Sequence, residues 1–354
     1  MIEPRPVLAP TTRRGMDPPR GFDGRACLQT ALEMTGLASL YVRLRGVRGA
    51  TILAYHSVTE ARDQPWVDPR YQIRAPNFER QMRFLARRRR VVSMTRLAEA
   101  VENGDDLPAG TVALTFDDGY LSHLTVAAPI LEKYGLPATF LLPTGYVRRG
   151  QVQWADRLYG LFQRRTAHRL GWNGEEVDLR DPLRASDAYR RASLALLEAG
   201  YEERQRLLDD LEARLRPDGH PPRMTMTWSD VRALTGRSPA FEIGGHTRDH
   251  LDLRAHASLA TAEITACAEE IEAEVGAPPR HFSFPYGRWT PDAQKTLRSL
   301  GFRSSVGAGL DFLIRKTSDR FALPPLDPLV SRARFAYLTS GAHPGLTRAL
   351  VGRA

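Results

Sequence analysis

Two adjacent carboxylates end a short apolar run in this 354-residue chain. Residues 112–120 read V-A-L-T-F-D-D-G-Y, so Asp117 and Asp118 follow a predicted strand and precede Gly119. Neighbouring side chains of a strand point to opposite faces, but the turn that glycine permits beyond the strand lets both carboxylates face one cleft. Two acids in one cleft are unfavourable unless a cation or a proton separates their roles. The pair therefore predicts acid–base or metal chemistry at the carboxyl edge of a sheet.

Two histidines later in the chain could complete a metal site. His246 and His250 are four residues apart, a spacing that places two imidazoles on one face of a helical turn. Thr247 stands where the H-E-x-x-H motif has its glutamate, so a base must come from the aspartate pair. Two imidazoles, one carboxylate and an open position form the ligand set of catalytic zinc sites. Alternatively, His246 is a hydrogen-bonded core residue and His250 a surface one.

The elements that must position these side chains alternate between strand and helix. Apolar, β-branched runs predict strands at residues 51–55, 112–116, 138–142, 240–245 and 281–284. Helical patterns separate most of them, and the strand exits carry polar or glycine-rich sequence. Such alternation is typical of a mainly parallel α/β sheet or barrel, whose strands share one carboxyl edge. His56 follows the first of these strands, where a single histidine is usually structural.

The alternation is interrupted between about residues 147 and 238. Segments 154–165 and 185–216 are rich in Arg, Glu and Leu and predict helices with no strand between them. We interpret this stretch as a helical insertion, and favour a surface elaboration without a catalytic part. The predicted organisation has three parts: an N-terminal extension (1–46) with an amphipathic helix (26–44), one catalytic domain (47–340) and a tail (341–354).

Three motifs together resemble a known family. T-F-D-D-G-Y at 115–120, H-T-R-D-H at 246–250 and F-P-Y-G at 284–287 are similar in order and spacing to the NodB-homology polysaccharide deacetylases, carbohydrate esterase family 4. The resemblance implies a distorted (β/α) barrel and metal-dependent hydrolysis of an N-acetyl group on a sugar. It also implies a role for each matched residue. Asp117 would be the general base, and Asp118, His246 and His250 would bind one divalent ion, which we expect to be zinc. Pro285 and Tyr286 would line the acetyl pocket, with the Tyr286 N–H in the oxyanion hole.

The sequence departs from the family pattern at two places. The late leucine-x-x-histidine motif, which usually provides the general acid, is missing. Tyr55-His56 resembles the permuted order of a subgroup similar to poly-N-acetylglucosamine deacetylases, which implies that His56 is the acid. The arginine that many members place before the Pro-Tyr pair is also missing, because that position holds Ser283 or Phe284.

Composition limits the other classes of function. The net charge of +9 is carried almost entirely by arginine, and its densest run, residues 87–90, closes a predicted helix, where cations suit the dipole. No nucleic-acid motif accompanies it, so we expect no nucleic-acid partner. Cys27 and Cys267 are the only cysteines, which excludes a disulfide framework and a cysteine zinc site.

The expected partner is an N-acetylated saccharide. The alternatives are a hydrolase of small non-sugar amides on the same scaffold and a carbohydrate-binding relic without turnover. No segment approaches the ~18 apolar residues of a membrane span, and no export signal is visible, which favours the cytoplasm. The 26–44 helix could hold the protein peripherally at the inner face of a membrane.

Overall fold

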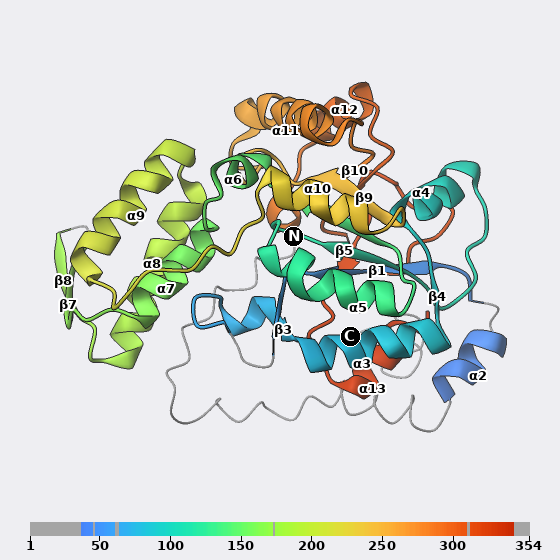
Figure 1. Ribbon diagram of the computed structural model, residues 1–354, viewed down its shortest axis with the longest axis horizontal. Coiled ribbons are helices and arrows are strands. Elements are labelled where there is room, and N and C mark those ends of the chain that lie inside the picture. Colours follow the sequence, from blue (N-terminus) through green and yellow to red (C-terminus); the bar gives the residue numbers. More distant parts are fainter. Residues whose placement is uncertain (1–36, 45–46, 61–63, 173, 310–311, 343–354) are drawn as a thin grey trace, which may run out of the picture.

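The centre of the molecule is a parallel sheet. The computed structural model describes residues 37–44, 47–60, 64–172, 174–309 and 312–342 (Figure 1). The strand order is β11-β10-β9-β6-β5-β1-β12, and β4 also pairs with β5. These strands are β1 Ala50–Tyr55, β4 Arg90–Val91, β5 Thr111–Phe116, β6 Ala138–Leu142, β9 Phe241–Gly245, β10 His281–Ser283, β11 Ser304–Val306 and β12 Pro325–Leu326.

The two edges of this sheet approach each other. Val306 at the end of β11 forms a parallel bridge to Leu323, and two residues later β12 pairs with Ile52 and Leu53 of β1. One short segment therefore contacts both the first and the last strand. The result is the nearly closed, distorted (β/α) barrel that the motifs predicted.

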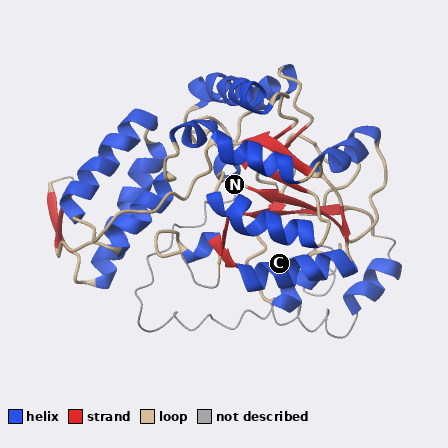
Figure 2. Ribbon diagram, viewed as in Figure 1, coloured by secondary structure: helices blue, strands red, loops and turns tan. Residues whose placement is uncertain are grey.

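Helices cover the outside of the barrel (Figures 1 and 2). They are α2 Leu37–Leu44, α3 Ala75–Arg88, α4 Met94–Asn103, the π-helical turn η2 His123–Ala127 continued by α5 Ala128–Lys133, α10 Trp228–Arg237, α11 Ala260–Val275, α12 Pro291–Ser299 and α13 Arg332–Leu338. Capping residues in the sequence determine where these helices begin. In α12, for example, the Thr290 side chain accepts a hydrogen bond from the N–H of Ala293, and Pro291 is the first helical residue. A short parallel pair, β2 Ser57–Thr59 and β3 Gln72–Arg74, lies beyond β1.

The insertion leaves the barrel after β6 and forms a separate helical group, on the left of Figure 1. It contains α7 Trp154–Gln163, β7 Arg169–Trp172, β8 Glu175–Asp178, α8 Pro182–Glu198 and α9 Tyr201–Leu215. Helix α6 Thr144–Arg149 links β6 to this group and lies against α11 of the barrel. Helices α7, α8 and α9 pack around their own buried apolar cluster. The prediction of no strand here is wrong, because β7 and β8 form an antiparallel hairpin whose Leu170 and Val177 cover that cluster.

Two further expectations need comment. Residues 334–338, whose apolar character suggested a strand, belong to α13, because Ser331 caps a helix whose last turn buries Tyr337 and Leu338. Of the predicted helix at 26–44, only α2 lies within the described residues.

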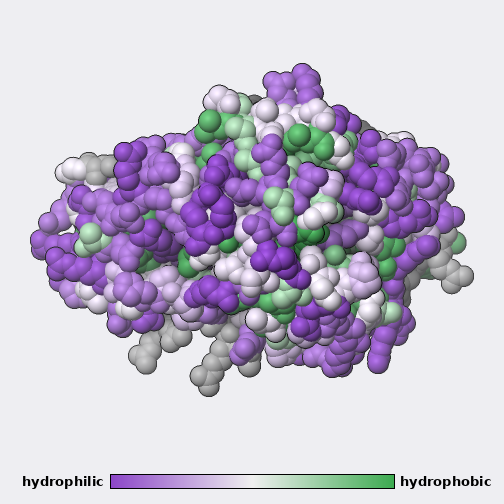
Figure 3. All heavy atoms as spheres, turned by 45° about the horizontal axis from the view of Figure 1, so that its top comes forward, coloured by the Kyte–Doolittle hydropathy of each residue, from purple (hydrophilic) through white to green (hydrophobic). Residues whose placement is uncertain are grey.

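Within the described ranges, no helix is both long enough and apolar enough to cross a bilayer. The face drawn in Figure 3 is mainly hydrophilic, with smaller hydrophobic areas scattered across it.

Candidate metal centre and active site

The register of β1 and β5 sets the floor of the site. The two strands pair from Ala50 with Thr111 to Tyr55 with Phe116, so both end at the same level. The N–H of Asp117 then donates to the carbonyl of Tyr55, at 2.9 Å. His56 and Asp117 are thereby the first residues beyond two neighbouring strands, which brings the predicted acid and base to one edge.

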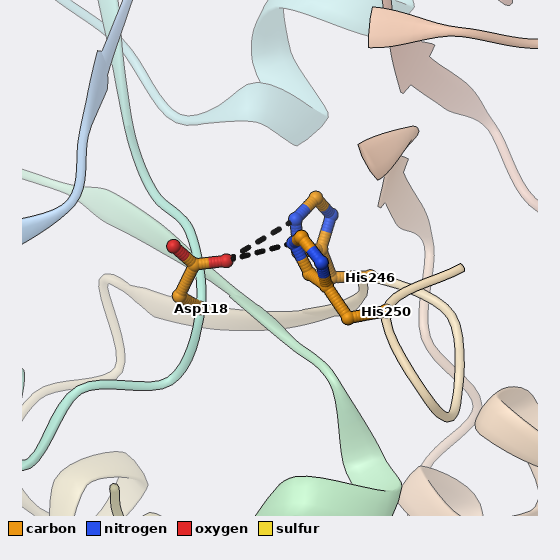
Figure 4. A group of neighbouring side chains, drawn as sticks. All are labelled: Asp118, His246 and His250. Carbon is orange, nitrogen blue, oxygen red and sulfur yellow. Dashed lines mark ion pairs between the residues drawn. The ribbon is translucent and has the colours of Figure 1, made fainter. Parts of the chain in front are cut away.

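Asp118, His246 and His250 converge on one point, although 128 to 132 residues separate the aspartate from the histidines (Figure 4). One ligand atom from each lies within 4.8 Å of the others. Oδ1 of Asp118 is 3.1 Å from Nε2 of His250 and 3.5 Å from Nε2 of His246. Oδ1 is buried, yet it forms no hydrogen bond of acceptable geometry, despite these short distances. The lone pairs of these three ligand atoms point at a shared centre, where they would repel one another but could all bind one divalent ion.

The other nitrogen of each imidazole is already engaged. Nδ1 of His246 donates to the carbonyl of Ser283 at 2.7 Å, because a carbonyl can only accept. Nδ1 of His250 lies 3.0 Å from the hydroxyl of Tyr286. Such outer contacts fix the tautomer and leave Nε2 free to bind metal. Both contacts come from the F-P-Y-G segment and the residue before it.

The charge states also suit a metal site. Burial lowers the pKa of His250 to about 4, so its ring is neutral and keeps a lone pair at neutral pH. Burial opposes ionisation of Asp118, but its contacts with His246 and His250 outweigh that cost and hold the pKa of the carboxyl well below its usual value. Burial opposes protonation of His246, but its contact with Asp118 and the nearby Asp117 outweigh that cost and raise the pKa of its imidazole. A divalent ion would take the place of that proton, so one carboxylate and two imidazoles fit such an ion.

The backbone of the site is strained. Five non-glycine residues among those described have positive φ, and four of them are Asp118 (72°), Thr247 (61°), His250 (52°) and Tyr286 (60°). A side chain in this region costs about 1–3 kcal/mol and persists only where the surroundings enforce it. Two of the three metal ligands thus occupy backbone conformations that the local sequence does not favour.

Asp117 has the environment of a general base. Its Oδ2 accepts a hydrogen bond from Oγ of Ser283 at 3.1 Å. Its Oδ1 is buried and has no hydrogen-bond partner among the described residues. Burial raises the pKa of this carboxyl, partly offset by the nearby His246. Ser283 is one of the two residues that could stand at the position of the missing motif-three arginine, and its hydroxyl contacts Asp117.

His56 is half-buried at the exit of β1. Its ring lies 5.5 Å from the ring of Tyr71, and its charge favours the ionised forms of both Asp117 and Asp118. Its carbonyl accepts a hydrogen bond from Nε2 of His123 at 2.9 Å. His123 follows the aspartate pair by about one helical turn, a position where a helix-surface residue is expected from the sequence. It is instead fully buried, with its ring packed against Phe116 and other aromatic rings, because η2 turns inward.

The remaining predicted site residues also lie at this edge. Pro285 is buried, whereas the Tyr286 side chain is 40% exposed and directs its hydroxyl towards His250. Trp154 and Asp156 had suggested a sugar contact, but both are buried: the Trp154 N–H donates to Tyr286, and Asp156 accepts from Tyr120. Neither side chain is an open platform for a sugar.

The fold is an α/β barrel, and the carboxyl ends of its strands carry an Asp-His-His cluster that could hold a divalent ion. Residues 104–177 and 217–305 match the family model of the polysaccharide deacetylases. Over these two segments the chain is similar to the polysaccharide deacetylases, and its Asp-His-His triad is consistent with a divalent-metal site. No curated protein sequence matches the chain.

Solved structures share the fold at low identity. The Streptococcus pyogenes deacetylase PplD in complex with acetate is 16% identical, with a TM-score of 0.55, over 83% of this chain and 99% of that one. IcaB from Ammonifex degensii is 20% identical, with a TM-score of 0.54, over 83% and 97%. A de-N-acetylase from Aggregatibacter actinomycetemcomitans is 18% identical, with a TM-score of 0.52, over 82% and 99%. At these identities the likeness shows the fold.

Proposed function

We propose that this protein hydrolyses N-acetyl groups of an N-acetylhexosamine within a polysaccharide or glycan, with one zinc ion held by Asp118, His246 and His250. The observation that carries the proposal is the convergence of these three ligands beside the unpartnered buried oxygen of Asp117. The family match and the neighbouring structures named deacetylase and de-N-acetylase support it.

The bound ion would supply Lewis acidity, which polarises the acetyl carbonyl and lowers the pKa of the attacking water towards ~7. The residues of the chain complete the reaction. Oδ1 of Asp117 takes the proton of the water as its oxygen attacks the acetyl carbon. The N–H of Tyr286 binds the oxyanion that forms, and Pro285 lines the acetyl pocket. The C–N bond then breaks, and His56 protonates the departing amine, so the products are acetate and a free amino sugar.

Acetate release should depend strictly on a divalent ion. We expect the protein as purified to release acetate from N-acetylglucosamine oligomers, to lose this activity on chelation and to recover it on addition of Zn²⁺, because in the proposed mechanism the bound ion polarises the acetyl carbonyl. Enzymatic quantification of acetate across a panel of acetylated glycans measures this. Activity that survives complete removal of metal, or metal-loaded protein that releases no acetate from any acetylated glycan, would contradict the proposal. Release from small amides alone would favour the small-amide alternative.

The role of His56 can be separated from that of Asp117 by changing the leaving group. We expect His56→Gln to lose about 10²–10⁴-fold in kcat on an acetamide, whose amine must be protonated to leave. On an aryl acetate ester the same variant should keep most of its rate, since a phenolate departs without a proton. Parallel kcat measurements on both substrates test this. An equal loss on amide and ester would show that His56 has another role.

A further inference from the structure

Side chains of the insertion contact the loops that carry the metal ligands. Nε2 of Gln153 donates to the carbonyl of Asp118 at 3.0 Å, and Nε1 of Trp154 donates to the hydroxyl of Tyr286 at 2.9 Å. Nη1 of Arg204 donates to the carbonyls of Asp249 and His250, at 3.2 and 3.3 Å. Gln153 caps α7 and Trp154 begins it, and Arg204 belongs to α9. One structural unit thus reaches all three motifs.

Three of the four contacted residues have strained backbones. Asp118, His250 and Tyr286 all have positive φ, and each receives a hydrogen bond from the insertion on its backbone carbonyl or its side chain. Non-glycine residues hold such conformations only when their surroundings enforce them. A donor fixed on a neighbouring helix supplies that enforcement, because rotation of the peptide group would break its hydrogen bond.

Arg204 has an unusual environment for a cation. Its side chain is fully buried, and its guanidinium carbon lies 5.2 Å from the centre of the Trp154 ring. Four backbone carbonyls accept its hydrogen bonds: those of Leu196 and Ala199 at the α8–α9 junction and those of Asp249 and His250 in the metal loop. A buried cation is costly unless its donors are satisfied. Arg204 therefore joins the insertion to the loop that presents the second histidine ligand.

Trp154 extends this arrangement to the ligand itself. Its indole N–H donates to the Tyr286 hydroxyl, which in turn contacts Nδ1 of His250. An indole can only donate, so the hydroxyl keeps a lone pair available for the imidazole N–H. The side chain of Trp154 is 6% exposed, which holds the indole in place.

We propose that the insertion is part of the scaffold of the metal centre, and that Gln153, Trp154 and Arg204 are positioning residues that set its affinity for the ion. The proposal rests on the metal site proposed above. It replaces the expectation of a surface elaboration. Arg204 lies between the two segments that match the family model, so this contact is a feature of this chain and not of the matched pattern.

Two tryptophans of the insertion provide a matched test. Trp154 and Trp172 are equally buried, each 6% exposed, but the indole N–H of Trp172 has no acceptor among the described residues. We expect Trp154→Phe to weaken Zn²⁺ binding about 10-fold, as loss of outer-shell contacts typically does. Trp172→Phe should leave Zn²⁺ affinity unchanged. Competition with a chromophoric chelator measures both, and the visible spectrum of the Co²⁺-loaded proteins should change for Trp154→Phe alone.

The outcomes separate this inference from the function proposed above. If the wild-type protein binds no Zn²⁺, the proposed metal site fails, and the inference fails with it. If the wild-type protein binds Zn²⁺ and both variants match it in affinity and in Co²⁺ spectrum, only the inference is overturned. Equal losses in both variants would also overturn it, since they would reflect general damage to the insertion.

A pair of arginines extends the test. Arg165 resembles Arg204 in donating to backbone carbonyls, those of Phe162 and Leu179, but both lie inside the insertion. We expect Arg204→Met to lose more Zn²⁺ affinity than Trp154→Phe, and Arg165→Met to lose thermal stability while its folded form binds Zn²⁺ like the wild type. If Arg204→Met does not fold, the tryptophan pair alone decides the question. If it folds and binds Zn²⁺ normally, the role of Arg204 is overturned.

Discussion

Replacing Asp117 by asparagine should reduce kcat for acetamide hydrolysis by about 10³-fold while leaving the bound ion in place, within the ~10²–10⁴-fold range of general acid–base catalysis. The structure separates the two functions. Oδ1 of Asp117 lies beside the triad and has no hydrogen-bond partner among the described residues, whereas the neighbouring Asp118 is the proposed metal ligand. Asparagine keeps the size of the side chain and can still accept from Ser283, but its amide cannot take a proton from water.

Metal content and turnover should therefore separate in this variant. Elemental analysis after dialysis should give the same zinc content for Asp117→Asn and for the wild type, with kcat measured on the same samples. Ser283→Ala is a useful companion, because it removes only the hydrogen bond that orients the base and should cost far less, about 10-fold, in line with a net hydrogen bond of ~1 kcal/mol. If the Asp117→Asn variant keeps the kcat of the wild type, another residue must carry out the proton transfer. If the wild type releases no acetate and Asp117→Asn binds glycan as well as the wild type does, the alternative of a carbohydrate-binding relic without turnover is favoured.

The alternation of strands and helices and the composition of the site follow closely from the sequence. Each motif stands directly after an apolar run, and parallel pairing brings those strand ends to one edge, so Asp118, His246 and His250 could be placed together without coordinates. The helical insertion could also be located, since its charge-rich pattern interrupts the alternation. These features depend on local periodicity and on spacing within one segment, which a single sequence carries.

What could not be predicted depends on contacts between distant segments. Nothing local distinguishes Ser283 as the partner of Asp117, 166 residues away, or shows that Arg204 is buried against the His250 loop. His123 looked like a helix-surface residue, because its burial results from a π-helical turn that regular helical periodicity does not describe. The positive φ values of Asp118 and His250 run against the preferences of those residues, and tertiary contacts supply the compensation. Functional sites are where such conflicts between local and global structure are expected.

Removal of Asp118 should abolish the metal centre itself. We expect Asp118→Ala to lose Zn²⁺ affinity by more than the ~10–100-fold typical of outer-shell changes, and to lose detectable acetate release with it. The physical reason is that Asp118 supplies the only negative charge in the triad, and it lies close to both Nε2 atoms, at 3.1 and 3.5 Å. Two neutral imidazoles alone neither balance the charge of a divalent ion nor complete three protein ligands.

A folding control gives this result its meaning. Asp230 in the capping box of α10 accepts from the N–H of Thr227, so Asp230→Ala should cost stability, about 0.5–2 kcal/mol, without affecting the metal. Zinc titration and thermal unfolding of both variants then separate loss of a ligand from loss of structure. If the Asp118→Ala variant still binds one equivalent of Zn²⁺ with wild-type affinity, the ion binds elsewhere in the protein. In that case the unpartnered oxygen of Asp117 could not be the base, because no activated water would lie beside it.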